Sequence, residues 1–182
     1  NNSGSLTVTN STLSGNTAGN GGGFNNSGTL TVSNSTISGN TANYGGGIYN
    51  NLGIVNVTNS TLSGNTASLG GGGGIFNGGT LTILTVTNST LSGNSAASSG
   101  GGIYNNSGTL TLTNSTLSGN TASLGDGGGI YNISGSTTLT NSTLSGNSAA
   151  NQGGGIYNRF GSLTLTNSTL SGNSAANQGG GI

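Results

Sequence analysis

Apolar and polar residues alternate over short segments that recur along the whole chain. A representative segment, residues 109–113, reads Thr-Leu-Thr-Leu-Thr. Strict alternation of apolar and β-branched polar residues predicts a half-buried β-strand. Residues 115–120 predict a second short strand after a bend at Asn114, and a third, glycine-rich segment runs from Thr121 to Asn132. No segment places apolar residues at helical spacing, and the abundant Gly and β-branched residues disfavour helix.

These three segments make up one repeat, which is marked by the string Asn-Ser-Thr-(Leu/Ile)-Ser-Gly-Asn. The string begins at Asn10, Asn34, Asn59, Asn88, Asn114, Asn141 and Asn167. Intervals of 24–29 residues between these positions are typical of a solenoid, in which each repeat is one coil. We therefore predict an all-β fold: a right-handed parallel β-helix (β-solenoid) of about seven coils, with three short strands per coil.

The repeat covers the chain from end to end, so residues 1–182 are predicted to form a single β-solenoid repeat domain. Because there is no initiator Met and no leader segment, we expect a fragment or processed piece of a longer repeat array. The repeat length varies mainly between the Gly-Asn step and the following Gly-Gly-Gly, which predicts loops on one side of the coil. The recurrent glycine triplets predict a tight corner, left-handed or bulged, that only Gly accepts.

Stacking the repeats aligns their apolar residues into columns that are predicted to point inward. One repeat cannot bury these side chains alone, whereas a stack of coils makes them one continuous core. The three main columns are Leu6, Leu30, Val55, Leu84, Leu110, Thr137 and Leu163; Val8, Val32, Val57, Val86, Leu112, Leu139 and Leu165; and Leu13, Ile37, Leu62, Leu91, Leu117, Leu144 and Leu170.

The composition excludes several classes of partner. Asp126 and Arg159 are the only charged side chains, and there is no Lys, Glu, His, Cys, Met, Trp or Pro. Nucleic-acid binding depends on clustered Lys and Arg, so we expect no nucleic-acid partner. No apolar run approaches the roughly 20 residues of a membrane span, so we expect no direct membrane insertion in this segment. Without Cys or His, we expect no metal site and no cofactor.

Catalysis is not expected. Glycoside hydrolysis typically needs two carboxyl groups, and this chain has one, on Asp126. The Ser and Thr hydroxyls have no His or Lys base to activate them. We interpret Asp126 as a solvated turn residue and Arg159 as a surface cation. A polysaccharide-active β-helix enzyme is therefore the most distant alternative.

Asparagine forms the strongest polar pattern, because it recurs at fixed positions of the repeat. Identical amides stacked about 4.8 Å apart can hydrogen-bond along a column, so we predict inward-facing structural ladders. The two main ladders are Asn10, Asn34, Asn59, Asn88, Asn114, Asn141 and Asn167; and Asn16, Asn40, Asn65, Asn94, Asn120, Asn147 and Asn173. A third column is predicted at Asn25, Asn50, Asn77, Asn105, Asn132 and Asn158. Each Asn-Ser-Thr is also a glycosylation sequon, but an inward bend Asn could not accept a glycan.

An aromatic residue recurs beside a column of Ile. We interpret these residues as a ladder of stacked rings whose hydroxyls reach water; the alternative is a strip for stacking carbohydrate. The aromatic column is Phe24, Tyr49, Phe76, Tyr104, Tyr131 and Tyr157.

Threonine dominates the outward positions of the alternating strand. This Thr-x-Thr array resembles the face of β-solenoid ice-binding proteins, although Thr is also a favoured exposed strand residue. The outward pairs are Thr7/Thr9, Thr31/Ser33, Asn56/Thr58, Thr85/Thr87, Thr111/Thr113, Thr138/Thr140 and Thr164/Thr166.

Residues 117–120, Leu-Ser-Gly-Asn, precede Gly-Gly-Gly-Ile at residues 127–130. This combination resembles the chlamydial-type polymorphic outer-membrane protein repeat, which pairs Phe-x-x-Asn with Gly-Gly-x-Ile; Leu or Ile stands here in place of the Phe. The resemblance implies a pectate-lyase-like right-handed β-helix on a bacterial surface, used in adhesion or as a displayed stalk. It does not identify a ligand.

Together these patterns predict a structural β-solenoid that is extracellular or on a bacterial cell surface. We expect either a fibre formed by end-to-end self-association or the stalk of a surface adhesin. The sequence does not identify a surface carbohydrate or host ligand. An ice-binding protein that uses the Thr-x-Thr face is the alternative function.

Overall fold

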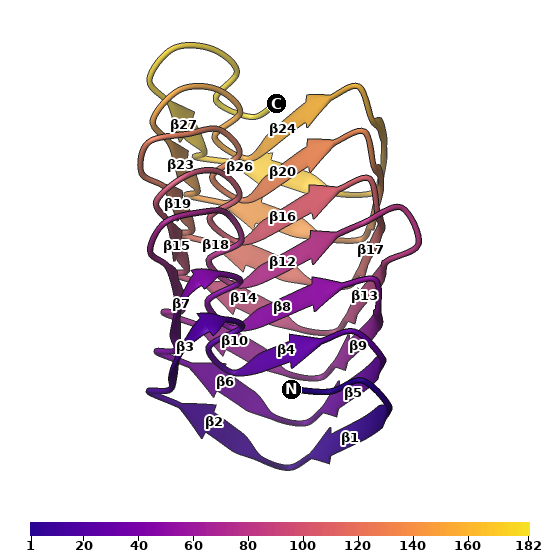
Figure 1. Ribbon diagram of the computed structural model, residues 1–182. Coiled ribbons are helices and arrows are strands. Elements are labelled where there is room, and N and C mark those ends of the chain that lie inside the picture. The colour runs from indigo at the N-terminus through magenta and orange to yellow at the C-terminus, as the bar shows by residue number, and fades with distance from the viewer.

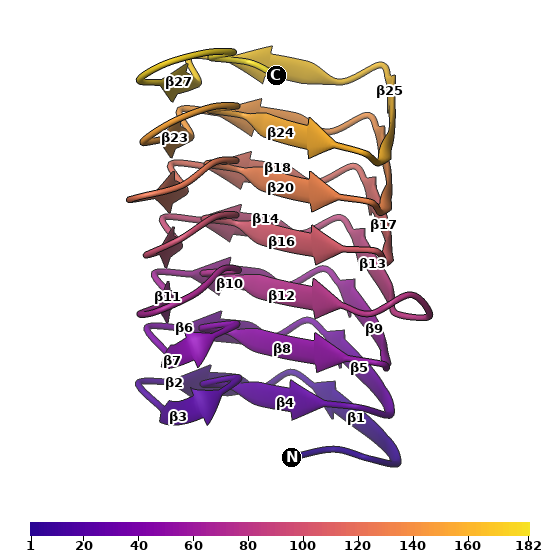
Figure 2. The same cartoon turned by 45° about the horizontal axis from the view of Figure 1, so that its top comes forward.

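The computed structural model describes residues 1–182, which wind into one continuous stack of coils (Figure 1). The chain contains 27 β-strands and no helix, and no helix that could span a membrane is therefore present. In Figure 2 the chain crosses the front from left to right, turns to the back and rises, so the winding is right-handed. The predicted right-handed parallel β-solenoid is confirmed.

The strands form four parallel sheets that extend along the solenoid axis. In the order in which the chain enters them in each coil, we call these sheets B, C, D and A. Sheet B comprises β1 (Ser5–Thr9), β5 (Thr29–Ser33), β9 (Ile54–Thr58), β13 (Ile83–Thr87), β17 (Thr109–Thr113), β21 (Ser136–Thr140) and β25 (Ser162–Thr166). Sheet C comprises β2 (Thr12–Ser14), β6 (Thr36–Ser38), β10 (Thr61–Ser63), β14 (Thr90–Ser92), β18 (Thr116–Ser118), β22 (Thr143–Ser145) and β26 (Thr169–Ser171).

The third segment of the repeat contains two strands, whereas the repeat pattern predicted one. Sheet D comprises β3 (Thr17–Asn20), β7 (Thr41–Tyr44), β11 (Thr66–Ala67), β15 (Ser95–Ala96), β19 (Thr121–Ala122), β23 (Ser148–Ala149) and β27 (Ser174–Ala175). Sheet A comprises β4 (Phe24–Asn26), β8 (Ile48–Asn51), β12 (Ile75–Gly78), β16 (Ile103–Asn106), β20 (Ile130–Ile133) and β24 (Ile156–Arg159). From β11 on, the strands of sheet D are only two residues long, so alternation cannot reveal them.

The corners of the coil are set by residues with left-handed backbone conformation. The bend between sheets B and C is an Asn in every coil, with φ of 50° at Asn114. The bend between sheets C and D is a Gly, with φ of 61° at Gly119. Gly accepts this conformation without a steric penalty, and Asn is the side chain that tolerates it best. The two bends therefore explain why the repeat carries Asn and Gly at fixed positions.

The predicted apolar columns point inward and form one core. Leu110, Leu112 and Leu117 are fully buried, and neighbouring coils pair them in register with residues of the same column. Thr137 stands in the Leu110 column and is also buried. Burial of apolar surface contributes about 25 cal/mol per Å², so this shared core stabilises the stack.

Variable loops lie where the sequence predicted them, between sheets D and A, at the left of Figure 1. An insertion between β12 and β13 extends from the opposite side, where Leu81 is exposed. The glycine triplets lead into the strands of sheet A. A Cβ on Gly128 would lie 2.5 Å from the carbonyl oxygen of Gly154 in the next coil. Backbone contact between coils therefore requires Gly at this corner.

Candidate functional site

An asparagine ladder runs through the interior at the corner between sheets C and D. Asn120 is fully buried; its backbone N–H and Nδ2 donate to Oδ1 of Asn147, at 3.0 and 2.9 Å. The same Nδ2 also donates to the carbonyl oxygen of Leu91 in the coil below, at 3.0 Å. This pattern recurs in every coil along Asn16, Asn40, Asn65, Asn94, Asn120, Asn147 and Asn173.

A second asparagine ladder follows sheet A. Asn105 Nδ2 donates to Oδ1 of Asn132 at 2.8 Å and to the carbonyl oxygen of Gly108 at 3.0 Å. The sequence placed Asn25 in this column, but Asn26 occupies it and donates to Asn50. The ladder comprises Asn2, Asn26, Asn50, Asn77, Asn105, Asn132 and Asn158.

The bend asparagines do not form an inward ladder, so that prediction was wrong. Their side chains are exposed in all seven coils: Asn10, Asn34, Asn59, Asn88, Asn114, Asn141 and Asn167. Among them, Asn114 donates to Asn88 at 3.2 Å and Asn141 donates to Asn114 at 3.3 Å, both at the surface. Asn occupies this position because it tolerates the left-handed backbone conformation of the bend, and its amide points to solvent. The steric objection to glycosylation at these sequons is thereby removed.

The Ser after each bend forms an inward ladder that was not predicted from the sequence. The Ser142 hydroxyl is buried, donates to the carbonyl oxygen of Thr140 at 2.9 Å, and accepts the N–H of Ser115 at 3.2 Å. The column comprises Ser11, Ser35, Ser60, Ser89, Ser115, Ser142 and Ser168. In the sequence, only the invariant Ser at the second position of the Asn-Ser-Thr string indicated this column. With these ladders, no buried side-chain nitrogen or oxygen lacks a hydrogen-bond partner.

Aromatic rings form a stacked column on the outer surface of sheet A. Consecutive ring centroids lie 4.8–5.2 Å apart, with interplanar angles of 8–19°, along Tyr49, Phe76, Tyr104, Tyr131 and Tyr157. Tyr44 from β7 contacts Phe76 edge to face, with centroids 5.9 Å apart. Because each inner ring face is covered by the next ring, a sugar cannot stack on it. This geometry favours the ladder over the carbohydrate strip.

Phe24 was assigned to this aromatic column incorrectly. It pairs with Ile48 and is part of the buried apolar core, and Asn25 pairs with Tyr49. The first copy reads Gly-Phe-Asn-Asn where the second reads Gly-Ile-Tyr-Asn-Asn. The aromatic residue therefore fills the Ile position there, which residue type alone did not reveal.

Burial raises the pKa of two tyrosines in the column above the usual value. Burial is the main cause at Tyr104, with Tyr44 nearby as a second cause. Burial is also the main cause at Tyr131, where the adjacent Tyr104 and Tyr157 would repel a tyrosinate. The stacked arrangement therefore favours the neutral form of both phenols.

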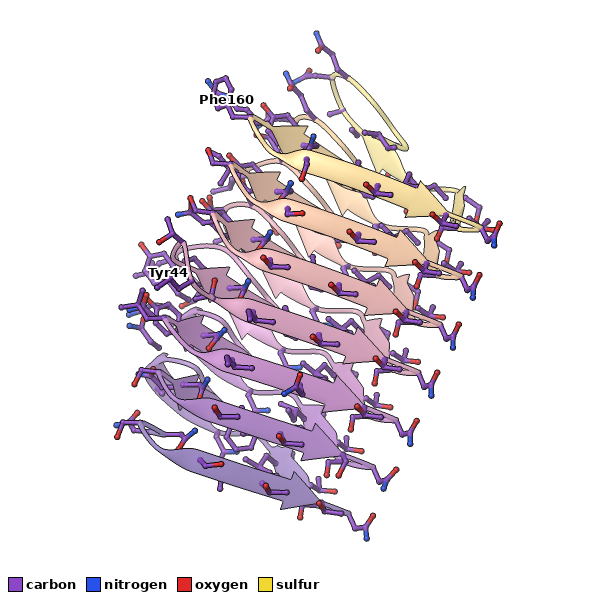
Figure 3. The ribbon with its side chains drawn as sticks, turned by 90° about the vertical axis from the view of Figure 1, so that its right-hand side faces the viewer. Tyr44 and Phe160 are labelled. Atoms are coloured by element: carbon purple, nitrogen blue, oxygen red, sulfur yellow. The ribbon has the colours of Figure 1, made fainter.

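The outward Thr residues of sheet B stand in rows along the axis, and Figure 3 views this face directly. Thr85 pairs with Thr111, and Thr87 pairs with Thr113, so like residues stack in register. Ile54 and Ile83 interrupt the hydroxyl surface at one edge of the face, and both are exposed. Sheet C adds an unbroken outward Thr column: Thr12, Thr36, Thr61, Thr90, Thr116, Thr143 and Thr169.

Asp126 lies in the segment between β19 and β20, and Arg159 is the last residue of β24. An Asp126 carboxylate oxygen accepts the backbone N–H of Gln152 at 3.1 Å. The Arg159 guanidinium lies 4.7 Å from the ring centroid of Phe160, which projects from a corner in Figure 3. No group of three or more His, Cys, Asp or Glu side chains comes together.

Comparison with known families identifies two of the repeats. Residues 88–106 and 141–159 match the Chlamydia polymorphic membrane protein (Chlamydia_PMP) repeat. Each match runs from a bend Asn to the end of a sheet A strand, so it includes the strands of sheets C, D and A. No curated protein and no solved structure matches the chain. The resemblance deduced from the motifs is thus confirmed for these two repeats.

We predict that the same substitution strongly lowers stability in the buried ladder and has almost no effect at the exposed bend. Asn120→Asp places a carboxylate against the Leu91 carbonyl and Asn147 Oδ1, both acceptors, and a buried unsatisfied group costs about 1–3 kcal/mol. The free energy of unfolding should fall by at least that amount in denaturant titration. Asn114→Asp, at an exposed bend that Asp tolerates, should change it by less than about 0.5 kcal/mol. Equal effects would show that the buried ladder is not stabilising.

Stability should be nearly constant between about pH 5 and 8, because the chain has so few charged side chains to link folding to protons. Above about pH 10 it should decrease. The unfolded tyrosines then lose protons that Tyr104 and Tyr131 retain in the fold, so high pH favours unfolding. Thermal melts across this range would measure both effects. A Tyr104→Phe/Tyr131→Phe variant should show a smaller alkaline decrease, and an unchanged decrease would contradict the assignment.

Proposed function

We propose that this chain is a structural element of an extracellular surface, which extends end to end as a fibre or as the stalk of an adhesin. The observation that carries the proposal is the continuity of the core. Inner members of each apolar column are fully buried, whereas Leu6, Val8 and Leu13 at one end are only partly buried. Leu163 and Leu170 at the other end are also only partly buried. A further coil in the same register, from another copy or from the same polypeptide, would continue this core.

The surface of the solenoid supports a structural role. Its outward strand positions are mainly Thr and Ser, and only one acidic and one basic side chain are present. Such a surface offers little for electrostatic recognition, and the buried ladders satisfy the polar interior without charge. The matched repeat belongs to a family of Chlamydia membrane proteins, which supports a place on a cell surface.

The fibre form of the proposal predicts that the purified 182-residue chain assembles into filaments as its concentration rises. Sedimentation would follow the assembly, and electron microscopy would show rods joined end to end. A chain that stays monomeric at high concentration would rule out the fibre. Denaturing mass spectrometry of native material then tests the stalk: a species near 17.2 kDa supports copies, and a much larger one supports a single long polypeptide.

Ice binding is a second candidate function, because the Thr columns of sheet B repeat in strict register. Successive strands are spaced about 4.8 Å apart and outward residues about 6.6 Å along each strand, which gives a regular lattice of hydroxyl and methyl groups. If this lattice orders water into ice, the chain should produce thermal hysteresis. Thr111→Tyr, on the centre of the face, should abolish the effect, whereas Thr116→Tyr on sheet C should not. Absence of hysteresis in the unmodified chain would reject this function.

A further inference from the structure

The buried side-chain ladders all have the same direction. In the ladder of sheet A and in the ladder at the C–D corner, each Asn amide donates to the Asn of the following coil. In the Ser column, each backbone N–H donates to the hydroxyl oxygen of the following coil. Three parallel rows of hydrogen bonds therefore point from the N-terminal to the C-terminal end.

The backbone fixes this direction at the C–D corner. Oδ1 of Asn147 faces the backbone N–H of Asn120, which is always a donor. Nδ2 of Asn147 faces the carbonyl oxygen of Leu117, which is always an acceptor. Rotating the amide by half a turn would put donor against donor and acceptor against acceptor. The ladder consequently cannot reverse its polarity within the fold.

The two ends of the stack are therefore chemically different. At the C-terminal end, Asn173 accepts from Asn147 and donates to the carbonyl oxygen of Leu144, while its backbone N–H and second Nδ2 hydrogen have no acceptor. At the N-terminal end, Asn16 donates to Asn40, while its Oδ1 has no donor and its second Nδ2 hydrogen has no acceptor. The free groups of the two ends are thus complementary: the two donors of Asn173 match the Oδ1 acceptor of Asn16. Backbone groups of a parallel sheet edge include both kinds and do not impose this difference.

We propose that the ladders make self-association strictly head to tail: the C-terminal end of one copy binds the N-terminal end of a second copy. This inference rests on the proposed end-to-end extension and adds the relative orientation of neighbouring copies. Asn173 donates through its backbone N–H and Nδ2 to Oδ1 of Asn16 in the next copy, and that Asn16 amide donates back to the carbonyl oxygen of Leu170. The contact repeats the bonds between inner coils. Two C-terminal ends would oppose donors, so closed pairs are disfavoured and filaments grow as open polar rods.

A matched pair of charge substitutions tests the polarity. Asn173→Asp and Asn16→Asp each add one negative charge, and each removes one Nδ2 hydrogen bond within its own chain. In the Asn173→Asp variant the new carboxylate faces the oxygen of the incoming Asn16, so the assembly concentration should rise about tenfold or more. In the Asn16→Asp variant the carboxylate replaces the Nδ2 that donates to the Leu170 carbonyl, so the assembly concentration should rise to a comparable extent. Asn114→Asp, with the same charge on an exposed mid-chain bend, should assemble as the unmodified chain does.

A mixing experiment gives a second measurement that does not depend on the stability of the end coils. Asn173→Asp copies can still bind through their N-terminal end to a growing filament, but their own C-terminal end then blocks growth. Asn16→Asp copies are blocked at the other end, so an equimolar mixture of the two variants should form pairs but no filaments, whereas each variant alone should stay monomeric at that concentration. If the unmodified chain forms filaments and either variant alone forms pairs through its unmodified end, the polarity is wrong while end-to-end stacking stands. If the unmodified chain forms no filaments, the stacking itself fails.

Discussion

Hydrogen bonding between identical residues of successive coils is the interaction on which this solenoid depends. Each inner coil buries one Ser hydroxyl and two Asn amides. Left without a hydrogen-bond partner, each of these groups would cost about 1–3 kcal/mol. The ladders solve this problem by making each coil the partner of the next: Asn120 satisfies Asn94 below it and is satisfied by Asn147 above. A residue can do this only if the neighbouring coil has the same residue in the same register. The repeat of the sequence is therefore a physical requirement of the fold.

The same register determines the surface. Once the inward columns are aligned, the outward residues align as well, because strand side chains alternate between the two faces. Thr rows on sheets B and C and stacked rings on sheet A all follow from this alignment. Insertions are accepted only where they leave the columns undisturbed. The insertion before β13 places Thr82 at the corner that Gly108 occupies in the next coil. The Thr82 carbonyl oxygen accepts the N–H of Thr109, and the Gly108 carbonyl oxygen accepts the N–H of Ser136 in the same way.

The candidate site was predicted unevenly, and the errors have a common physical cause. Asn16 and its equivalents were placed correctly as an inward ladder, but the bend column of Asn114 was placed inward and is exposed. Recurrence of an Asn identifies a fixed role without distinguishing a hydrogen-bonding role from a backbone one, and Asn suits both an amide ladder and a left-handed bend. The Ser142 column was overlooked because Ser is equally common on exposed strands. Phe24 was misplaced because an aromatic ring also fits the apolar core.

The sequence by itself determined the solenoid, the number of coils, the inward Leu and Val columns and the position of the variable loops. Alternation and repeat spacing specify these features directly, because side-chain direction in a strand has a period of two and each repeat pairs with its neighbours. Only the tertiary structure decided how many sheets each coil forms, which Asn columns are buried, and in which direction the ladders point. Those properties depend on the φ angle at each bend and on the backbone group that faces each amide in the adjacent coil. The φ angle at each bend and the facing backbone group are defined only when the coils are stacked. The sequence of a single repeat therefore does not predict these properties.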